Sequence, residues 1–323
     1  MATGSRHHYF GNDAWEPLAP GLKTVEEATD IRRRILLAFE AAELHTSPEA
    51  RRQYLTFVII GGGPTGVELA GALSELARDT LRREFRSIDP AEARIVLVEG
   101  QDRILGAFPE DLSKKAAQSL AGLQVEVRTG CRVVGLEEGR VKFHCGDEKG
   151  EIAAATVLWA AGVRASPLGR VLRDRAGAEL DQSGRVIVGP DLSVPGHPEI
   201  FVIGDLAHYR HGLKAPLPAL ATVAMQEGRY AAGLIRKRIL GQPVEPFRYR
   251  DKGILATIGR SKAVAQLGRL KFSGFLAWFL WLAVHIFYLI EFQNRVLVMI
   301  QWAWNYLTRN RGARLITGEK PRE

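Results

Sequence analysis

Residues 54–68 read YLTFVIIGGGPTGVE, a run of β-forming apolar residues that ends in a cluster of glycines. A largely apolar run of this length predicts a strand from Tyr54 to Ile60 that is buried on both faces of a sheet. The residues after the glycines predict a helix from about Thr65 to Arg83. Strand, glycine cluster and helix, in that order, form the setting in which Gly-x-Gly-x-x-Gly binds a dinucleotide.

Each glycine of this motif has a distinct physical task. Gly61 permits the tight turn, Gly63 lets the backbone approach a pyrophosphate, and Gly66 lets the helix pack closely on the strand. Pro64 and Thr65 begin the helix, whose N-terminus favours an anion. The loop is therefore predicted to bind the pyrophosphate of NADH. The alternative is a glycine-rich turn without a ligand.

Two carboxylates near this loop are predicted to contribute to the site. Residues 94–99 form the next apolar strand, which ends on Glu99, where an acidic residue binds ribose hydroxyls and rejects a 2′-phosphate. Glu99 therefore favours NADH over NADPH, although its spacing from the loop is longer than usual. Glu68 lies in the first helical turn and is a candidate catalytic residue at the nicotinamide end. The alternatives are a solvated strand end for Glu99 and compensation of the helix dipole for Glu68.

The neighbouring sequence predicts further elements of an α/β fold. Thr24 and Glu27 have the spacing of a capping box before a helix that extends past Phe39. A short helix is predicted to begin at Ser47-Pro48. Further strands are predicted at residues 123–128, 133–143 (turning at Glu138-Gly139) and 155–160, so the sheet is expected to be parallel. Later elements are strands at 185–188 and 200–205 and a helix at 219–240, and His208 is expected to be structural.

Composition narrows the classes of partner. The chain has 323 residues, a formal net charge of +8 and 46% hydrophobic residues, which fits a folded protein of two domains or one large one. The basic residues gather at Arg32-Arg33-Arg34 and around the apolar C-terminal region. This pattern favours a membrane surface over nucleic acid. Cys131 and Cys145 have no metal-ligand spacing, so no metal site is expected. Two cysteines this far apart argue against a disulfide framework and fit a reducing compartment.

The C-terminal region is apolar and rich in tryptophan. Residues 272–290 are long enough to cross a bilayer, but residues 291–295 interrupt the run and residues 296–307 are too few to cross. Tryptophan favours the membrane interface. Two interfacial helices with basic margins predict a monotopic anchor. A single transmembrane span and a buried core helix are the alternatives. The tryptophans are Trp278, Trp281, Trp302 and Trp304, and the basic residues are Arg260, Lys262, Arg269, Lys271, Arg309, Arg311 and Arg314.

The glycine loop and Glu99 resemble the NAD half of flavoproteins that nest two dinucleotide-binding folds. Ala2-Thr3-Gly4 and Ile203-Gly204-Asp205 stand where that superfamily has the segments flanking its NAD domain. More narrowly, the chain resembles type II NADH:quinone oxidoreductase over essentially its whole length. The stretches that carry this resemblance are Tyr9-Phe10-Gly11, residues 20–24, Arg32-Arg33-Arg34, residues 159–163, residues 301–307 and residues 314–318.

This resemblance implies a respiratory-chain flavoprotein that passes hydride from NADH to FAD and electrons to a membrane quinone, without proton pumping. It also implies that the protein lies on the cytoplasmic face of the inner (plasma) membrane and contacts the lipid surface. Whether the protein forms a homodimer is left open. Residues 221–228 are similar to the family's A-Q-x-A-x-Q segment, with Thr222 at the first glutamine and Gln226 at the second, which would hold the quinone. The implied NADH contacts include Ala161 and Gly162. The implied FAD contacts are Thr3, Gly4, Gly204, Asp205, Ala221 and Thr222.

The chain departs from the family pattern at its start. The family begins with another strand–GxGxxG–helix, which holds the ADP half of FAD, and MATGSRHHYFG stands in its place. We therefore expect a nested two-dinucleotide fold that lacks about a hundred N-terminal residues and binds FAD weakly or not at all. The expected domains are 1–50 (remnant of the FAD domain and linking helix), 51–165 (NAD(H) domain), 166–248 (second part of the FAD domain) and 249–323 (membrane-anchoring region).

The sequence leaves two other functions open. One is a soluble FAD-dependent NAD(P)H reductase of a protein or disulfide substrate, which the apolar tail disfavours. The other is a non-catalytic, membrane-tethered NAD-binding remnant, which follows from the missing loop.

Overall fold

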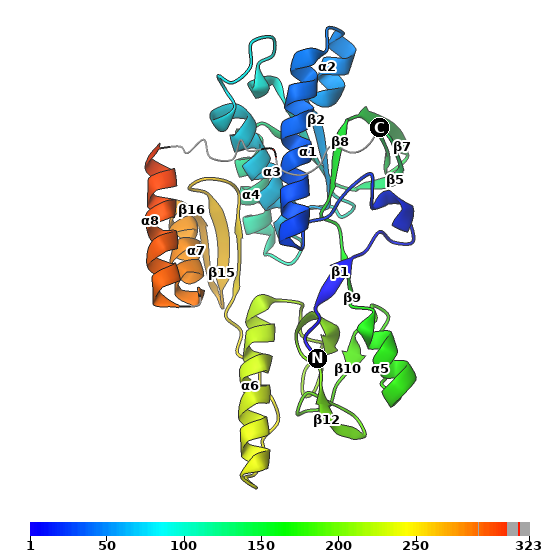
Figure 1. The fold of residues 1–323 in the computed structure, drawn as a ribbon, viewed down its shortest axis with the longest axis vertical. Helices are drawn as coiled ribbons and strands as arrows, with labels where there is room; N and C mark the ends of the chain where they lie inside the picture. The colour runs from blue at the N-terminus through cyan, green and yellow to red at the C-terminus, as the bar shows by residue number, and fades with distance from the viewer. Residues whose placement is uncertain (290, 309–315, 317–323) are drawn as a thin grey trace. The chain divides into compact units, whose positions relative to one another are not determined.

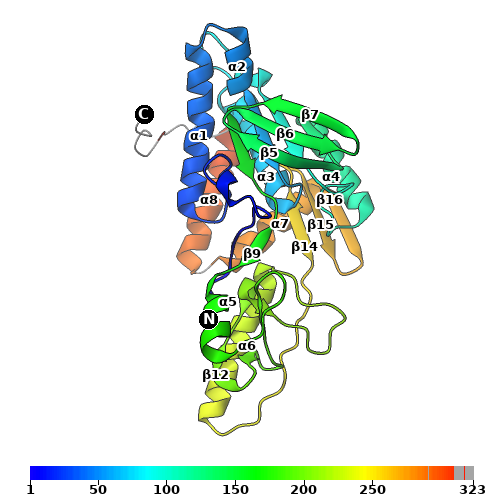
Figure 2. The ribbon, with the colours of Figure 1, turned by 90° about the vertical axis from the view of Figure 1, so that its right-hand side faces the viewer.

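The computed structural model describes residues 1–289, 291–308 and 316, and Figures 1 and 2 trace the chain. Two compact units make up the chain. The larger unit comprises Tyr9–Ala161 and Gly253–Glu323, and the smaller comprises Met1–His8 and Gly162–Lys252. The chain therefore passes between the units more than once, and each unit is described by itself below.

A four-stranded parallel sheet with the order β4-β3-β2-β8 forms the centre of the larger unit. Helix α3 connects β2 to β3, and helix α4 connects β3 to β4. The predicted parallel α/β sheet is confirmed. The bounds are β2 (Thr56–Ile60), α3 (Pro64–Glu75), β3 (Arg94–Val98), α4 (Glu110–Gly122), β4 (Val125–Arg128) and β8 (Thr156–Trp159).

Both faces of this sheet are covered, so its two central strands, β2 and β3, are apolar at most positions. Alternate side chains such as Phe57 and Ile95 pack with α1 (Val25–Leu44), α3 and α4. On the other face, Val58 and Val96 pack against a three-stranded antiparallel meander, which is in clear view in Figure 2. The meander consists of β5 (Cys131–Glu137), β6 (Arg140–Cys145) and β7 (Glu148–Ala153).

The predicted helix starts are confirmed. Thr24 Oγ1 accepts a hydrogen bond from Glu27 N at 3.1 Å, and Glu27 Oε2 accepts one from Thr24 N at 2.9 Å, which completes the capping box of α1. Ser47 caps α2 (Pro48–Tyr54), since its Oγ accepts a hydrogen bond from Ala50 N at 3.4 Å. Because α2 includes Tyr54, the strand expected from that residue begins at Thr56.

Several predicted boundaries were wrong, and two groups of strands were missed. Helix α3 ends at Glu75 and continues as a π-helical segment, Leu76–Thr80, instead of reaching Arg83. Helix α4 extends to Gly122, so β4 begins two residues later than the predicted strand. Neither β7 nor the antiparallel sheet of β14 (Ile254–Thr257), β15 (Ala263–Leu267) and β16 (Leu270–Gly274) was predicted.

Cys131 and Cys145 form a disulfide, although their separation in the sequence argued against a disulfide framework. The hairpin of β5 and β6 places these residues directly opposite each other, with their Cα atoms 4.1 Å apart. The separation of two cysteines in the sequence does not show whether they can bond, because a hairpin brings the end of its second strand back beside the start of its first. The pairing register was the missing information.

The smaller unit contains three two-stranded sheets and two helices. Strands β10 and β13 are parallel, and the other pairs are antiparallel. The expected strand at 200–205 is wrong in its boundaries, because β12 ends at Phe201 and Asp205 lies in a 3-10 turn (Gly204–Leu206). The bounds are β1 (Ser5–His7), β9 (Val163–Ala165), α5 (Leu168–Ala176), β10 (Val186–Ile187), β11 (Ser193–Val194), β12 (His197–Phe201), β13 (Ala207–His208) and α6 (Ala221–Ile239).

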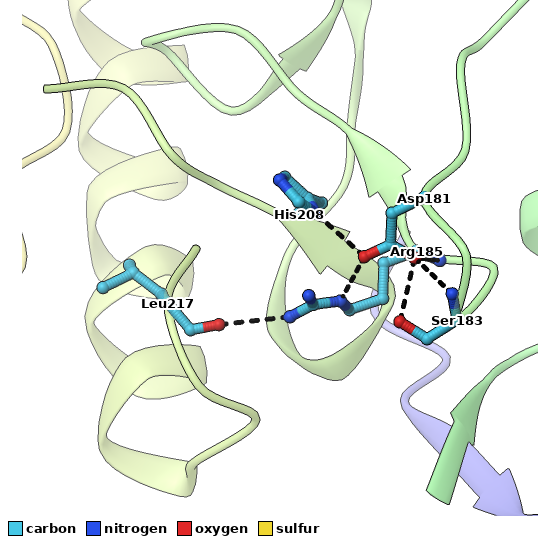
Figure 3. A network of polar contacts seen from close by, with 5 residues as sticks. All are labelled: Asp181, Ser183, Arg185, His208 and Leu217. Carbon is cyan, nitrogen blue, oxygen red and sulfur yellow. Dashed lines mark hydrogen bonds and ion pairs between the residues drawn. The ribbon is translucent and has the colours of Figure 1, made fainter. Parts of the chain in front are cut away.

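Asp181 is the centre of a polar network in this unit (Figure 3). Its carboxylate accepts hydrogen bonds from Arg185 Nε at 2.8 Å and Ser183 Oγ at 2.9 Å, and His208 Nδ1 lies 2.8 Å away. Burial alone would raise the pKa of Asp181, but the hydrogen bonds from His208 and Arg185 hold it well below its usual range. The expected structural role of His208 agrees with this arrangement.

The C-terminal apolar region forms two helices, α7 (Phe275–Tyr288) and α8 (Phe292–Thr308). Its first residues, from Phe272 to Gly274, belong to β16 instead of to a helix. Among the residues that the structure describes, no helix has the length and apolar character to cross a membrane. Residue 290, the basic residues 309, 311 and 314, and most of the motif at 314–318 lie outside the described residues.

Candidate nucleotide and flavin sites

The glycine loop has the geometry that its sequence predicts. Gly61 has a φ of 107°, a conformation that residues with a Cβ rarely adopt. A Cβ on Gly66 would lie 1.8 Å from Gly61 O, so α3 can approach β2 only because residue 66 is glycine. Gly63 is different, because a Cβ there would meet nothing within 4 Å. The open space beside Gly63 fits the predicted approach of a pyrophosphate, which stays a prediction.

Glu99 follows β3 and is anchored to the glycine loop. Its Oε2 accepts a hydrogen bond from Gly62 N at 2.5 Å, and its Oε1 accepts one from Gln101 N at 2.7 Å. A carboxylate offers about four lone-pair positions. Two positions remain for ligand hydroxyls, and the two backbone donors fix the direction in which the carboxylate points.

A cavity of about 450 Å³ lies at this edge of the sheet. Trp159 forms part of its wall and packs against Tyr9 and Trp15 in tilted ring contacts, at ring-centroid distances of 4.7 Å and 5.9 Å. Apolar walls with a few directed polar groups are typical of a nucleotide pocket. The structure thus brings Gly61, Glu99 and Ala161 together around one cavity. Its lining also includes Gln101, Cys131 and Val133.

Glu68 connects α3 to the C-terminal sheet. Its Oε1 accepts a hydrogen bond from Thr257 N at 3.2 Å, and burial raises the pKa of its carboxyl. Two helical turns later, Glu75 accepts a hydrogen bond from Arg260 N, and burial again raises the pKa. Glu68 is therefore more than a charge at the helix N-terminus, and its predicted catalytic role stays a prediction.

The residues predicted to contact FAD lie in the smaller unit. Ser5 Oγ donates a hydrogen bond to Asp205 Oδ2 at 2.6 Å, next to Thr3 and Gly4 in the sequence. The turn that contains Gly204 packs against the first turn of α6, since a Cβ on Gly204 would lie 3.3 Å from Ala224 Cβ. The structure therefore places Asp205 beside the α6 N-terminus, where Ala221 and Thr222 begin the helix. The hydroxyl of Thr222 lies 3.1 Å from that of Tyr249.

The Gln226 amide is engaged with backbone groups. Its Nε2 donates to Thr222 O at 3.1 Å and to Arg250 O at 2.9 Å, and its Oε1 accepts from Arg250 N at 3.0 Å. Both amide protons are used in this arrangement. The predicted hydrogen bond to a quinone carbonyl stays a prediction, and it would require one of these bonds to be exchanged.

Glu227 is a buried carboxyl that the sequence reading missed. Its side chain belongs to a residue only 1% exposed, and Oε2 accepts a hydrogen bond from Gly204 N at 2.6 Å. Burial, together with the nearby Asp205 carboxylate, raises the pKa of Glu227 to about 7. The sequence signal for its burial was its position next to Gln226, on the apolar face of helix α6.

These residues fit one half of FAD. Asp205 offers an acceptor to ribityl hydroxyls, and the adjoining helix N-terminus can meet the flavin ring. Within residues 1–289, 291–308 and 316, a single strand–GxGxxG–helix unit is present, and it forms the cavity with Glu99. The assignment of these residues to the ribityl chain and flavin ring, and of the glycine loop to a dinucleotide, stays a prediction.

Comparisons with known proteins identify the family of this chain. The pyridine nucleotide-disulphide oxidoreductase family model matches residues 1–228, and the NDH2 C-terminal domain model matches residues 252–310. Two Mycobacterium tuberculosis proteins, the type II NADH:quinone oxidoreductases Ndh and NdhA, are 41% and 42% identical over 99% of this chain. The chain spans 69% and 68% of their respective lengths.

The fold agrees with a solved structure as well. NDH2 from Plasmodium falciparum, in complex with NADH, superimposes with a TM-score of 0.86 at 18% identity, covering 98% of this chain and 78% of that one. This likeness concerns the fold alone, whereas the two mycobacterial relatives carry the assignment to a family. The chain therefore belongs to the type II NADH:quinone oxidoreductases, within the pyridine nucleotide-disulphide oxidoreductase family.

Proposed function

We propose that this chain functions in NADH:quinone oxidoreduction, with FAD as the redox group and NADH bound in the cavity beside Gly61 and Glu99. The glycine loop joined to Glu99 by the Gly62 hydrogen bond is the observation that carries the proposal. When bound, FAD would supply a two-electron acceptor between NADH and quinone. The protein binds and orients the reactants.

Specific residues take specific parts in this proposal. The N-terminus of α3 binds the NADH pyrophosphate, and Glu99 accepts hydrogen bonds from the adenosine ribose. Asp205 accepts hydrogen bonds from the ribityl chain of FAD. Glu68 holds a proton more readily than an exposed glutamate, because burial raises its pKa. That property suits a group that supplies a proton as quinone is reduced, since reduction to quinol consumes two protons per molecule.

Glu99→Arg is expected to weaken NADH binding about tenfold and to reverse the preference over NADPH. The substitution removes two acceptor sites for ribose hydroxyls and introduces a charge that attracts a 2′-phosphate. The measurement is the dissociation constant of each nucleotide, from the fluorescence of the bound dihydronicotinamide.

Glu138→Arg is the matched control, because it makes the same charge change at an exposed turn of the same unit. It should leave both dissociation constants unchanged. An unaltered NADH to NADPH ratio in Glu99→Arg would refute the ribose role. Reduction of an added quinone by NADH in the presence of FAD tests the complete reaction.

We also propose that α7 and α8 form a monotopic anchor on the cytoplasmic face of the inner membrane, close to the lipid-soluble quinone. Large apolar side chains of these helices are exposed, including Phe279 at 56%, Phe287 at 68% and Trp304 at 64%. Trp281 and Trp302 stack across the two helices with their ring centroids 5.4 Å apart. Exposed apolar area of this kind, with tryptophan and basic neighbours, fits the headgroup boundary of a bilayer.

Substituting Phe279, Phe287 and Trp304 together by glutamate is expected to lower partitioning onto anionic vesicles at least about tenfold. Each glutamate removes apolar area that would enter the bilayer, and each adds a charge of the same sign as the lipid. Vesicle flotation measures the bound fraction.

The control is a triple glutamate variant at Leu44, Val134 and Ile239, which are exposed apolar residues outside α7 and α8. It makes the same charge change and should still float with lipid. Equal release of both variants would show that charge alone governs binding, which contradicts the anchor.

A further inference from the structure

The Cys131–Cys145 disulfide lies at the wall of the proposed NADH cavity. Cys131 is the first residue of β5 and lines the cavity, and Cys145 is the last residue of β6, next to the exposed turn at 146–147. Cys131 is 5% exposed, whereas Cys145 is partly exposed. A reagent from solution therefore reaches the Cys145 sulfur more readily than that of Cys131.

Backbone hydrogen bonds connect the disulfide to the segment that carries Glu99. Cys131 N donates to Glu99 O at 2.9 Å, and Gly130 N donates to Gln101 O at 2.8 Å. On the preceding residues, Glu99 N donates to Arg128 O at 2.8 Å. The side chain of Glu99 is in turn fixed by Gly62 N and Gln101 N. One hydrogen bond thus connects Cys131 to Glu99, and a second connects Glu99 to the glycine loop. A displacement of Cys131 would be transmitted to both.

The disulfide is a covalent link between the start of β5 and the end of β6. Because the Cys131 N–H donates to Glu99, it is not available to hydrogen bond with β6, and the disulfide links this residue to the opposite strand. The reduced state also has a place for its thiol. Thr129 O lies 3.3 Å from Cys131 Sγ, within reach of a hydrogen bond from the S–H group.

We propose that the Cys131–Cys145 disulfide is a reversible redox-modification site that controls NADH affinity, and that its reductant is a dithiol. This inference rests on the proposed NADH site. In a reducing compartment a disulfide of this kind is transient and regulatory, which reconciles its presence with a cytoplasmic location.

The exchange reaction is balanced in electrons and protons. A thiolate of the dithiol attacks Cys145 Sγ, the Cys131–Cys145 bond breaks, and Cys131 leaves as a thiolate that takes up a proton. The second thiol of the reductant then attacks the mixed disulfide and releases Cys145 as a thiol. Two electrons and two protons pass from the dithiol to the cysteine pair, and the dithiol becomes a disulfide.

Reduction is expected to weaken NADH binding. Without its link to β6, the start of β5 gains conformational freedom, and NADH binding must order it again. Ordering about one backbone residue corresponds to a roughly fivefold larger dissociation constant. The amide groups of Gln101 and Gly130 should also exchange hydrogen faster.

The experiment uses the full chain in its oxidised state and after treatment with excess dithiothreitol. A thiol count should change from none to two, the NADH dissociation constant should rise about fivefold, and amide exchange at residues 99–101 and 130–131 should accelerate. The double variant C131S/C145S should bind NADH like the reduced chain and should not respond to dithiothreitol.

Three results would overturn the proposal: two free thiols in the air-oxidised chain, equal NADH affinity in both states, or unchanged amide exchange on reduction. Failure of the proposed NADH function has a different signature. In that case neither state binds NADH, whereas the exchange measurement still reports whether the disulfide controls the Glu99 segment.

Discussion

Gly66→Ala is expected to lower the free energy of unfolding by about 3 kcal/mol and to abolish measurable NADH binding at micromolar protein concentrations. The new Cβ would stand 1.8 Å from Gly61 O and 3.3 Å from Ala160 Cβ. Gly61 cannot move aside freely, because a Cβ on that residue would already meet the Ala160 backbone at 2.6 Å. Helix α3 must therefore move away from β2, and the helix N-terminus is displaced from the pyrophosphate position.

Two other glycines separate the causes of this effect. Gly233→Ala adds a Cβ to helix α6, where nothing lies within 4 Å, and should leave stability equal or slightly higher. Gly63→Ala also meets nothing within 4 Å, so the fold should survive while NADH binding weakens. Chemical denaturation and nucleotide titration measure the two properties. Native stability and NADH affinity in Gly66→Ala would show that the loop geometry described above is incorrect.

Glu227→Gln is expected to remove a pH dependence of stability worth on the order of 2 kcal/mol between pH 5 and pH 8. Burial raises the pKa of Glu227 from 4.5 to about 7, so the folded chain keeps this proton in a pH range where the unfolded chain has lost it. The folded state then binds more protons, and stability falls as pH rises from 4.5 through 7. Glutamine carries no charge at any pH, and its carbonyl oxygen can still accept the Gly204 hydrogen bond.

Denaturant unfolding of the two proteins across this pH range measures the effect. The variant is expected to be the less stable protein at pH 5, because it buries two amide N–H groups where the protonated carboxyl has a single O–H group. It is expected to be the more stable protein at pH 8, because it carries no buried charge. Glu179→Gln changes an exposed carboxyl of the same unit and should follow the original chain. Parallel pH profiles for Glu227→Gln and the original chain would mean that Glu227 titrates normally.

Local patterns predicted the parts of this protein that neighbouring residues determine. The largely apolar run before Gly61 predicted a strand buried on both faces, because a sheet covered on both sides favours apolar residues on both faces of its central strands. Thr24 and Glu27 predicted the start of α1, since a capping box closes within one helical turn. Gly61 and Gly66 predicted a tight turn and a close helix, and the structure contains both.

Pairing between distant segments was decided by the tertiary structure alone. The bond between Cys131 and Cys145 depends on the register of β5 and β6, and one residue of slip would turn the two side chains to opposite faces. The hydrogen bond between Thr257 and Glu68 joins residues that 189 positions separate. In the sequence Glu227 is an ordinary helical glutamate, and only the structure shows that the turn at Gly204 covers it.

The sequence by itself therefore determined the dinucleotide loop, its acidic neighbour and the family. Each of these depends on residue type at short spacing, where steric and hydrogen-bond requirements act directly. The tertiary structure decided which carboxyls are buried, which backbone groups hold them, and how the disulfide is connected to Glu99. Burial and long-range hydrogen bonds arise from three-dimensional packing, and packing follows from all segments of a unit together.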